Sequence, residues 1–237
     1  MVGRAPALLR FWLLATLVVA WFAVVPHVAY IGHGWNVALV AALVLPGTLL
    51  LVLFALPLWD RRWLWAATLA LALLALLFTV LGWGLPANFA KLFAATFAGW
   101  AFLTLFEALS WVVLIAVVIP LVDIVSVWRG PTHAITEHHF SVYTNVAVAF
   151  VVPGGGAAYL GPPDILFYAL FLAAAARWRL RVVWTWVAMT GMYSLTVVVA
   201  NAADVGGLPA LPFLSFGFLV ANADLLWAQL RPRTTAS

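Results

Sequence analysis

The chain is poor in charged residues and has no cysteine. Charged residues make up 8% of the 237 positions, whereas hydrophobic residues make up 67%. Soluble globular chains carry about 25% charged residues, so this composition excludes a soluble domain and indicates a polytopic protein in a lipid bilayer. The absence of cysteine excludes a disulfide framework, a thiolate metal site and a cysteine nucleophile.

The few charges are mostly basic, with a formal net charge of +4. In a soluble chain this balance would favour a nucleic-acid partner. Here the basic residues stand between apolar stretches, where they report membrane topology instead. No binding to nucleic acid is therefore expected.

Windows of about 20 apolar residues predict eight transmembrane helices. They lie near residues 11–31, 36–58, 63–83, 88–105, 107–128, 157–176, 182–201 and 210–229. We expect an all-α polytopic membrane protein in which residues 1–84 form a three-helix scaffold and residues 85–237 form a five-helix unit.

The basic residues also predict the orientation of these helices. Arg61 and Arg62 occupy a short turn flanked by tryptophans, which is typical of a cytoplasmic loop. With the N-terminus inside, eight spans place nine of the 11 Lys and Arg residues on the cytoplasmic side and leave Lys91 and Arg129 outside. We therefore expect both termini in the cytoplasm and the polar loop 129–156 outside the cell membrane.

One carboxylate lies inside the apolar stretch 107–128. A charged side chain in hydrocarbon costs at least about 2.5–3.5 kcal/mol, so such an acid is a candidate functional residue. Asp123 stands about 8 Å of helix rise before Trp128, too deep for a short side chain to reach the headgroups easily. It needs a partner or a water-filled cavity.

A second carboxylate, Asp164, follows two prolines. Pro162 and Pro163 lack backbone donors, which predicts a partly unwound helix around Asp164. Irregular backbone at membrane depth is tolerated only beside protein or a water-filled cavity. Asp123 and Asp164 thus each need a polar partner, and each could be the partner of the other.

Two facing aspartates that share a proton and a water carry out the chemistry of aspartic proteases. Because like charges a few ångströms apart cannot both ionise, one acts as base and the other as acid. This chemistry needs no metal ion, cofactor or nucleophilic side chain. A proton or cation relay in a transporter and two unrelated structural acids are the other interpretations of the same pair, and the spacing leaves all three open.

A third motif, Leu208-Pro209-Ala210-Leu211-Pro212, stands just before the last apolar stretch. With it, the sequence resembles the presenilin and signal peptide peptidase superfamily of intramembrane aspartyl proteases, whose final helix begins with a Pro-Ala-Leu motif. The segment that starts at Asp123 is similar to the sixth helix of presenilin, and residues 160–168 are similar to the seventh. The resemblance covers about residues 85–230.

The resemblance implies a presenilin-like catalytic core within residues 85–237 and an intramembrane endopeptidase activity. It implies Asp123 and Asp164 as the catalytic pair. The substrates would be transmembrane proteins or signal-peptide segments, held beside Pro209, Ala210, Leu211 and Gly161.

Two positions depart from the family pattern. Val122 stands where the family usually has tyrosine, and Pro163 replaces the second glycine of its Gly-x-Gly-Asp motif. The first change removes a hydroxyl beside one aspartate, and the second removes a backbone donor beside the other. A catalytically inactive homologue is therefore an alternative beside the protease and the transporter.

The polar loop 129–156 carries two further patterns. Residues 140–150 alternate and are rich in β-branched types, so we expect a strand that could pair with an extended substrate above Asp164, and a flexible glycine hinge at 154–156. His133, Glu137, His138 and His139 lack the His-Glu-x-x-His spacing of zinc proteases, and we interpret them as solvated loop side chains, with no metal site.

Overall fold

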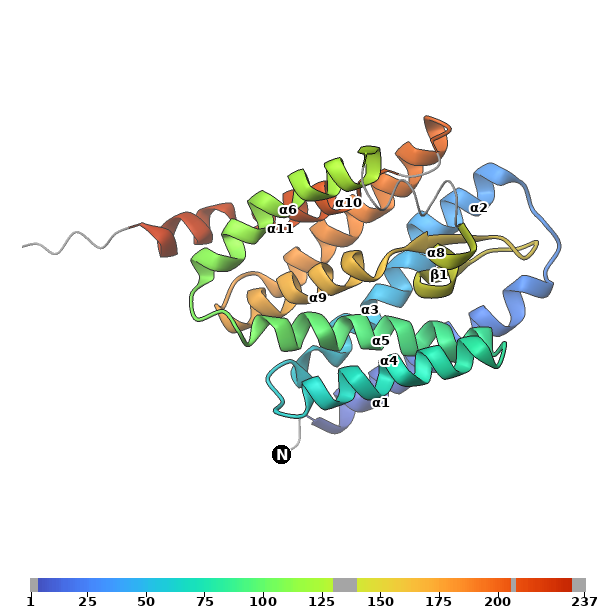
Figure 1. Ribbon diagram of the computed structural model, residues 1–237, viewed down its shortest axis with the longest axis horizontal. Helices are drawn as coiled ribbons and strands as arrows, with labels where there is room; N and C mark the ends of the chain where they lie inside the picture. The colour runs from blue at the N-terminus through green and yellow to red at the C-terminus, as the bar shows by residue number, and fades with distance from the viewer. Residues whose placement is uncertain (1–3, 130–139, 206–207, 232–237) are drawn as a thin grey trace, which may run out of the picture.

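The computed structural model describes residues 4–129, 140–205 and 208–231, which are mostly helical (Figure 1). The longer elements are α1 (Arg4–Val24), α2 (His33–Leu39), α3 (Leu45–Ala55), α4 (Leu64–Val80), α5 (Gly84–Leu103), α6 (Leu109–Arg129), α8 (Phe140–Val146), β1 (Val148–Val151), β2 (Ala157–Leu160), α9 (Pro162–Arg177), α10 (Val182–Ala202) and α11 (Leu211–Leu230). Short helical turns η1 (Val25–His27), η2 (Val40–Val44) and η3 (Leu56–Leu58) join some of them.

Five helical segments of the described chain are long and apolar enough to cross a bilayer. They are Leu9–His27, His33–Leu58, Leu109–Val127, Val182–Ala202 and Leu211–Leu230. A shorter apolar helix covers Leu64–Val80. The protein is thus mostly helical, as expected, and five such segments indicate a multi-pass membrane protein. The count of eight spans stays a prediction.

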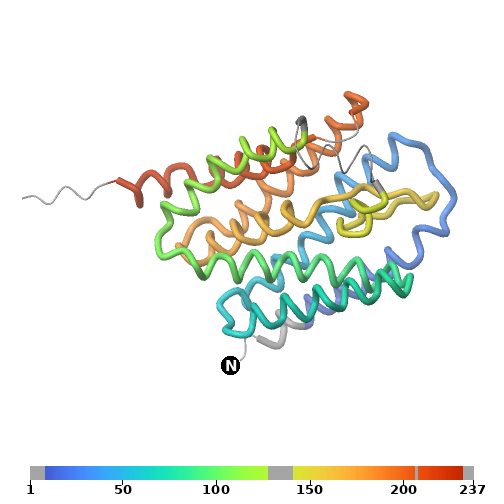
Figure 2. Tube along the Cα trace, in the orientation of Figure 1, coloured from blue at the N-terminus to red at the C-terminus, as the bar shows by residue number. Residues whose placement is uncertain are grey.

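Helix α9 lies at the centre of the bundle. Figure 1 shows α1, α4 and α5 along one side and α6, α10 and α11 along the other, and the tube in Figure 2 passes through α9 between α5 and the α10–α11 pair. The side chains from Tyr168 to Ala175 are all buried. Four of them are alanines, which let neighbouring helices approach closely. The segment that begins with Asp164 is therefore held firmly from several sides.

Asp164 lies in a regular helix, which corrects the prediction of an unwound segment. Helix α9 begins at Pro162, so both prolines occupy its first two positions. The N–H groups of a first turn have no partner within the helix, and the fixed φ of proline suits this place. The two prolines therefore start the helix and do not interrupt it.

The loop before α9 forms a helix and a β-hairpin, which corrects the prediction of one strand over 140–150. Residues 140–146 are helical as α8, and only Val148–Val151 form a strand, paired antiparallel with Ala157–Leu160. Gly154 and Gly155 have φ of 84° and 76° and make the hairpin turn. The glycines allow the left-handed backbone of this turn and do not form the hinge that was expected at 154–156.

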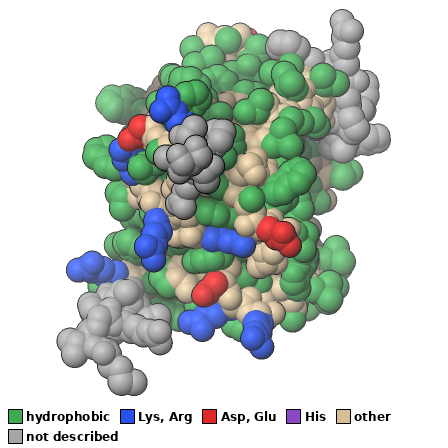
Figure 3. Space-filling model, turned by 90° about the vertical axis from the view of Figure 1, so that its left-hand side faces the viewer, with side chains coloured by type: hydrophobic (Ala, Val, Ile, Leu, Met, Phe, Trp, Pro, Cys, Tyr) green, Lys and Arg blue, Asp and Glu red, His purple; other side chains and the backbone are tan. Residues whose placement is uncertain are grey.

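Arginines gather at one end of the bundle. Figure 3 views the end at which the α3–α4 turn, the α9–α10 turn and the end of α11 lie, and several Lys and Arg side chains stand out on it. These turns contain Arg61, Arg62, Arg177, Arg179, Arg181 and Arg231. The hairpin and α8 lie toward the opposite end.

Candidate active site

Asp123 meets the start of α11. The backbone N–H of Leu211 donates to Oδ2 of Asp123 over 3.0 Å, and the backbone of Ala210 also binds this carboxylate. The N-terminus of a helix carries unpaired N–H groups and a partial positive charge, so it is a natural site for an anion. The Pro-Ala-Leu motif is therefore placed against the first of the two predicted aspartates, with Pro209 and Ala210 buried.

Asp164 binds the start of its own helix. The backbone N–H of Gly161 donates to Oδ2 of Asp164 over 2.9 Å. A side-chain carbon added at Gly161 would lie 3.3 Å from this oxygen and 3.5 Å from Pro163, so the glycine leaves room for the turn of the carboxylate. Each aspartate is thus held by a helix N-terminus, which is worth about 0.3–1 kcal/mol, or about 2 kcal/mol where partly buried.

The two carboxylates lie close enough for their charges to interact. They come from α6 and α9, 41 positions apart in the chain, and only the fold brings them together. Both also act on the same phenol. Burial, and after it the negative charges of Asp164 and Asp123, raise the pKa of Tyr143 above its ordinary value. Tyr143, Asp123 and Asp164 therefore form one electrostatic group.

Helix α10 holds α9 in place behind Asp164. The hydroxyl of Tyr193 donates to the backbone oxygen of Asp164 over 2.8 Å, and the hydroxyls of Tyr168 and Thr190 are 2.8 Å apart. The rings of Tyr168 and Tyr193 stack with centroids 5.8 Å apart. These bonds lie among buried side chains, where water does not compete for them, so they fix the first turn of α9.

Val122 and Pro163, the two departures from the presenilin pattern, have exposed side chains. Val122 is 55% exposed, although Asp123 next to it is partly buried. Pro163 is exposed at the second position of α9, where an N–H would have no helical partner. The hydroxyl and the backbone donor that these residues lack are therefore not required by the local fold.

The hairpin is attached to the bundle by side chains that imitate a neighbouring strand. Asn88 of α5 donates from Nδ2 to the oxygen of Ala149 over 3.0 Å and accepts from the N–H of Ala149 over 2.7 Å. Lys91 donates to the oxygen of Ala147, and Trp21 donates to that of Val151. The outer edge of β1 is thus already bonded to helices.

Replacing Asn88 with leucine is expected to lower the free energy of unfolding by about 2–4 kcal/mol. Leucine has a similar size but leaves the N–H and the oxygen of Ala149 without partners, at about 1–3 kcal/mol each. Thermal denaturation in detergent measures the loss. Asn201→Leu is the matched control, because Asn201 is exposed and bonds only to its own helix. Equal stability of the two variants would show that the Asn88 clamp contributes nothing.

A shallow apolar cavity of about 260 Å³ lies between α5, α6 and α9. Its lining includes Ile119 and Phe167, one helical turn from Asp123 and Asp164 respectively. The other lining residues are Phe102, Leu114, Ile115 and Val118. The cavity therefore reaches to within one helical turn of each carboxylate along α6 and α9 and offers only apolar side chains.

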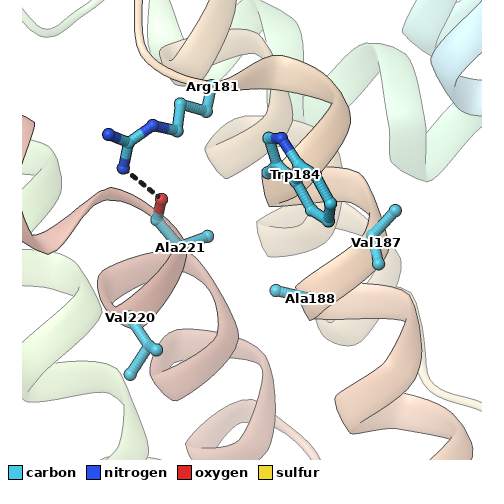
Figure 4. Close-up of a pocket in the computed structure, with 6 residues that line it drawn as sticks. All are labelled: Arg181, Trp184, Val187, Ala188, Val220 and Ala221. Carbon is cyan, nitrogen blue, oxygen red and sulfur yellow. Dashed lines mark hydrogen bonds between the residues drawn. The ribbon is translucent and has the colours of Figure 1, made fainter.

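A second cavity, of about 440 Å³, lies at the arginine-rich end (Figure 4). It is lined by Arg181, Trp184, Val187, Ala188, Val220 and Ala221. The guanidinium of Arg181 binds both carboxylate oxygens of Asp224 at 2.6 and 2.7 Å. Ala221 lies about 15 Å along α11 from Leu211, so this cavity is separate from the candidate active site.

The described residues contain no group of three or more His, Asp or Glu side chains suited to a metal ion. His133, Glu137, His138 and His139 lie outside the described part of the chain.

Sequence reasoning did not select Tyr143, Tyr193 or Asn88. An asparagine within an apolar stretch is a sequence signal that could have marked Asn88, whereas the position of the two tyrosines near Asp164 is known only from the fold.

The comparisons with known proteins identify no family for this chain. A scan against models of protein families finds no match, and a search of curated proteins finds no significant similarity either. The three motifs of the sequence meet at this site, and the family that they suggest stays a prediction.

Proposed function

We propose that the protein is an intramembrane aspartyl endopeptidase. The observation that carries the proposal is the pair Asp123 and Asp164, drawn from separate helices to within electrostatic reach and each held by a helix N-terminus. The contact of Asp123 with Leu211 supports it further, because a relay of protons has no evident need for a Pro-Ala-Leu motif. Residues 85–237 would then form a presenilin-like catalytic core.

The mechanism follows from the charge of the pair. One carboxylate is ionised and takes a proton from a water, whose oxygen attacks the carbonyl carbon of the substrate. The other carboxyl is protonated and gives its proton to the carbonyl oxygen, and the roles then reverse as the C–N bond breaks. Neither metal nor cofactor takes part.

The substrate would bind as an extended strand along β2. Cleavage requires a helix to unwind, because helical hydrogen bonds shield its carbonyl groups, and strand addition supplies replacement bonds. The outer edge of β1 is occupied by Asn88, whereas β2 leads directly into Gly161 and Asp164. The apolar cavity beside Ile119 and Phe167 would take apolar side chains of the same substrate.

We propose eight spans, with α4, α5 and α9 crossing the bilayer alongside the five long segments. Figure 1 shows these three helices running along the same axis as the others. The arginine-rich end and both chain termini would face the cytoplasm, and loop 129–156 would lie outside. By resemblance to signal peptide peptidases, substrates would be transmembrane segments or signal-peptide remnants with the N-terminus inside.

The absence of native cysteine makes this topology testable with single cysteine variants. Arg179→Cys and Asp204→Cys place a thiol at the two ends of α10, both exposed. An impermeant maleimide added to intact cells should label the Asp204 variant and leave the Arg179 variant unlabelled until the cells are opened. The reverse pattern would reject the proposed orientation.

The activity is tested with purified protein in liposomes and a single-span peptide that is labelled at both ends. Mass spectrometry follows the products for the wild type and for variants that lack either carboxylate. Cleavage that survives the loss of either aspartate would reject the dyad. Proton or cation flux that depends on Asp123 and Asp164, without cleavage, would favour the transporter, and a folded protein with neither activity would be an inactive homologue.

A further inference from the structure

Tyr143 lies next to the candidate active site. It belongs to none of the three sequence motifs, which contain Asp123, Asp164 and Pro209-Ala210-Leu211. Its half-buried ring approaches Gly161 so closely that a side-chain carbon there would lie 4.0 Å from Cε2 of the ring. Gly161 is the residue whose N–H binds Asp164. The ring is therefore next to the backbone that holds the second carboxylate.

The surrounding contacts fix the position of this ring. The ring of Tyr159 in β2 meets it edge to face, with centroids 6.4 Å apart. The backbone oxygen of Tyr143 accepts from the N–H of Ala147, just before β1. Lys91 of α5 in turn binds the oxygen of Ala147. The helix that carries Tyr143 is thus tied to the hairpin and through it to the bundle.

The phenol is a hydrogen-bond donor at any working pH. Its pKa is raised by burial and by the two carboxylates, so it keeps its proton. The other hydroxyl near Asp164, that of Tyr193, donates to the backbone oxygen of Asp164, and position 122 offers only an exposed valine. Both carboxylates also act on Tyr193, but its hydroxyl is already bonded behind Asp164, whereas Tyr143 approaches the two carboxylates from α8.

We propose that Tyr143 is a third catalytic side chain, whose phenol donates a hydrogen bond to the carbonyl oxygen of the substrate as water adds to the carbonyl carbon. This inference rests on the proposed protease function. The water oxygen bonds to the carbon, the water proton passes to the ionised aspartate, and the carbonyl oxygen takes the proton of the other aspartate. Tyr143 keeps its own proton and only stabilises the charge that develops on that oxygen.

The test replaces Tyr143 with phenylalanine, which keeps the ring against Gly161 and Tyr159 and removes the hydroxyl alone. In the liposome assay kcat should fall about 10- to 100-fold while KM stays within about twofold, since the bond forms in the transition state. A peptide analogue with a hydroxyl-bearing tetrahedral carbon at the scissile position should lose affinity by a similar factor. Tyr30→Phe is the matched control, because Tyr30 is 61% exposed and lies against the hairpin turn at Gly154, and it should retain wild-type kcat.

Each result decides the inference. Wild-type kcat in Tyr143→Phe would overturn it, and so would a variant that melts earlier and changes only KM, because that pattern reports a structural role. Asp123→Asn and Asp164→Asn are measured beside it. If these two are inactive and Tyr143→Phe keeps wild-type kcat, the inference alone fails; if they cleave like the wild type, the protease proposal fails and the inference with it.

Discussion

Replacing either Asp123 or Asp164 with asparagine is expected to lower kcat by about 10³- to 10⁴-fold. Asparagine has almost the same shape but can neither take the proton of the attacking water nor return one to the leaving amine. Because the two carboxylates act as one unit, the double variant should be no slower than the slower single variant. Cleavage of the labelled peptide in liposomes, followed over hours, measures these rates.

The stability of these variants separates a catalytic role from a structural one. Two aspartates that must share one proton in an apolar bundle are a costly arrangement, and replacing one of them with a neutral side chain relieves it. The melting temperature in detergent should therefore stay the same or rise while the activity disappears. A lower melting temperature with partial activity would instead assign the two acids a structural role.

Asp204→Asn is the matched control for the chemistry. Asp204 is exposed after the end of α10 and has φ of 51°, a left-handed conformation that asparagine also adopts. The substitution therefore removes a carboxylate without straining the chain. It should leave both kcat and the melting temperature unchanged, and a loss of activity here would point to a general effect of negative charge.

The sequence predicted the segments that meet at the site because their signals are local. Asp123 is a carboxylate within an apolar stretch, and the Pro-Ala-Leu motif around Ala210 is recognised from the sequence alone. The contact between Leu211 and Asp123 places these signals together. Whether the pair cleaves peptides stays a prediction, since the fold shows proximity and not chemistry.

The loop before α9 was predicted less well because its signals are not local. Val142, Thr144 and Val146 favour a strand, but β propensity is weak and yields to context, and these residues are helical. The clamp of Asn88 on Ala149 needs two segments 61 positions apart to meet. Tyr143 reaches the carboxylates by the same long-range packing, so no pattern in the sequence marks it.

Adding one methyl group at Gly99 is expected to damage both stability and activity. A side-chain carbon at Gly99 would overlap the backbone oxygen of Leu166 and lie 3.1 Å from the backbone N of Leu170. Neither atom can turn aside, because both belong to the central helix α9. In Gly99→Ala the helices must therefore separate, and small residues at such crossings are what allow close packing.

The separation would displace the second carboxylate, because Asp164 precedes Leu166 by only two residues in α9. A misplacement of about 1 Å at a reacting group can cost about 10²-fold in rate. We expect Gly99→Ala to lose about 1–3 kcal/mol of stability, as over-packed cores do, and about 10²-fold in kcat. Thermal denaturation in detergent and the liposome assay measure the two losses.

A graded series of glycines gives the controls. Gly191 in α10 has open space where the new carbon would lie, and at Gly217 in α11 the nearest backbone atoms are 3.0 Å away. Alanine favours a helix over glycine by about 1 kcal/mol, so Gly191→Ala should be neutral or stabilising. The loss should then increase from Gly191 through Gly217 to Gly99. If Gly99→Ala were as stable and active as Gly191→Ala, the close contact of α5 with α9 would not be what positions Asp164.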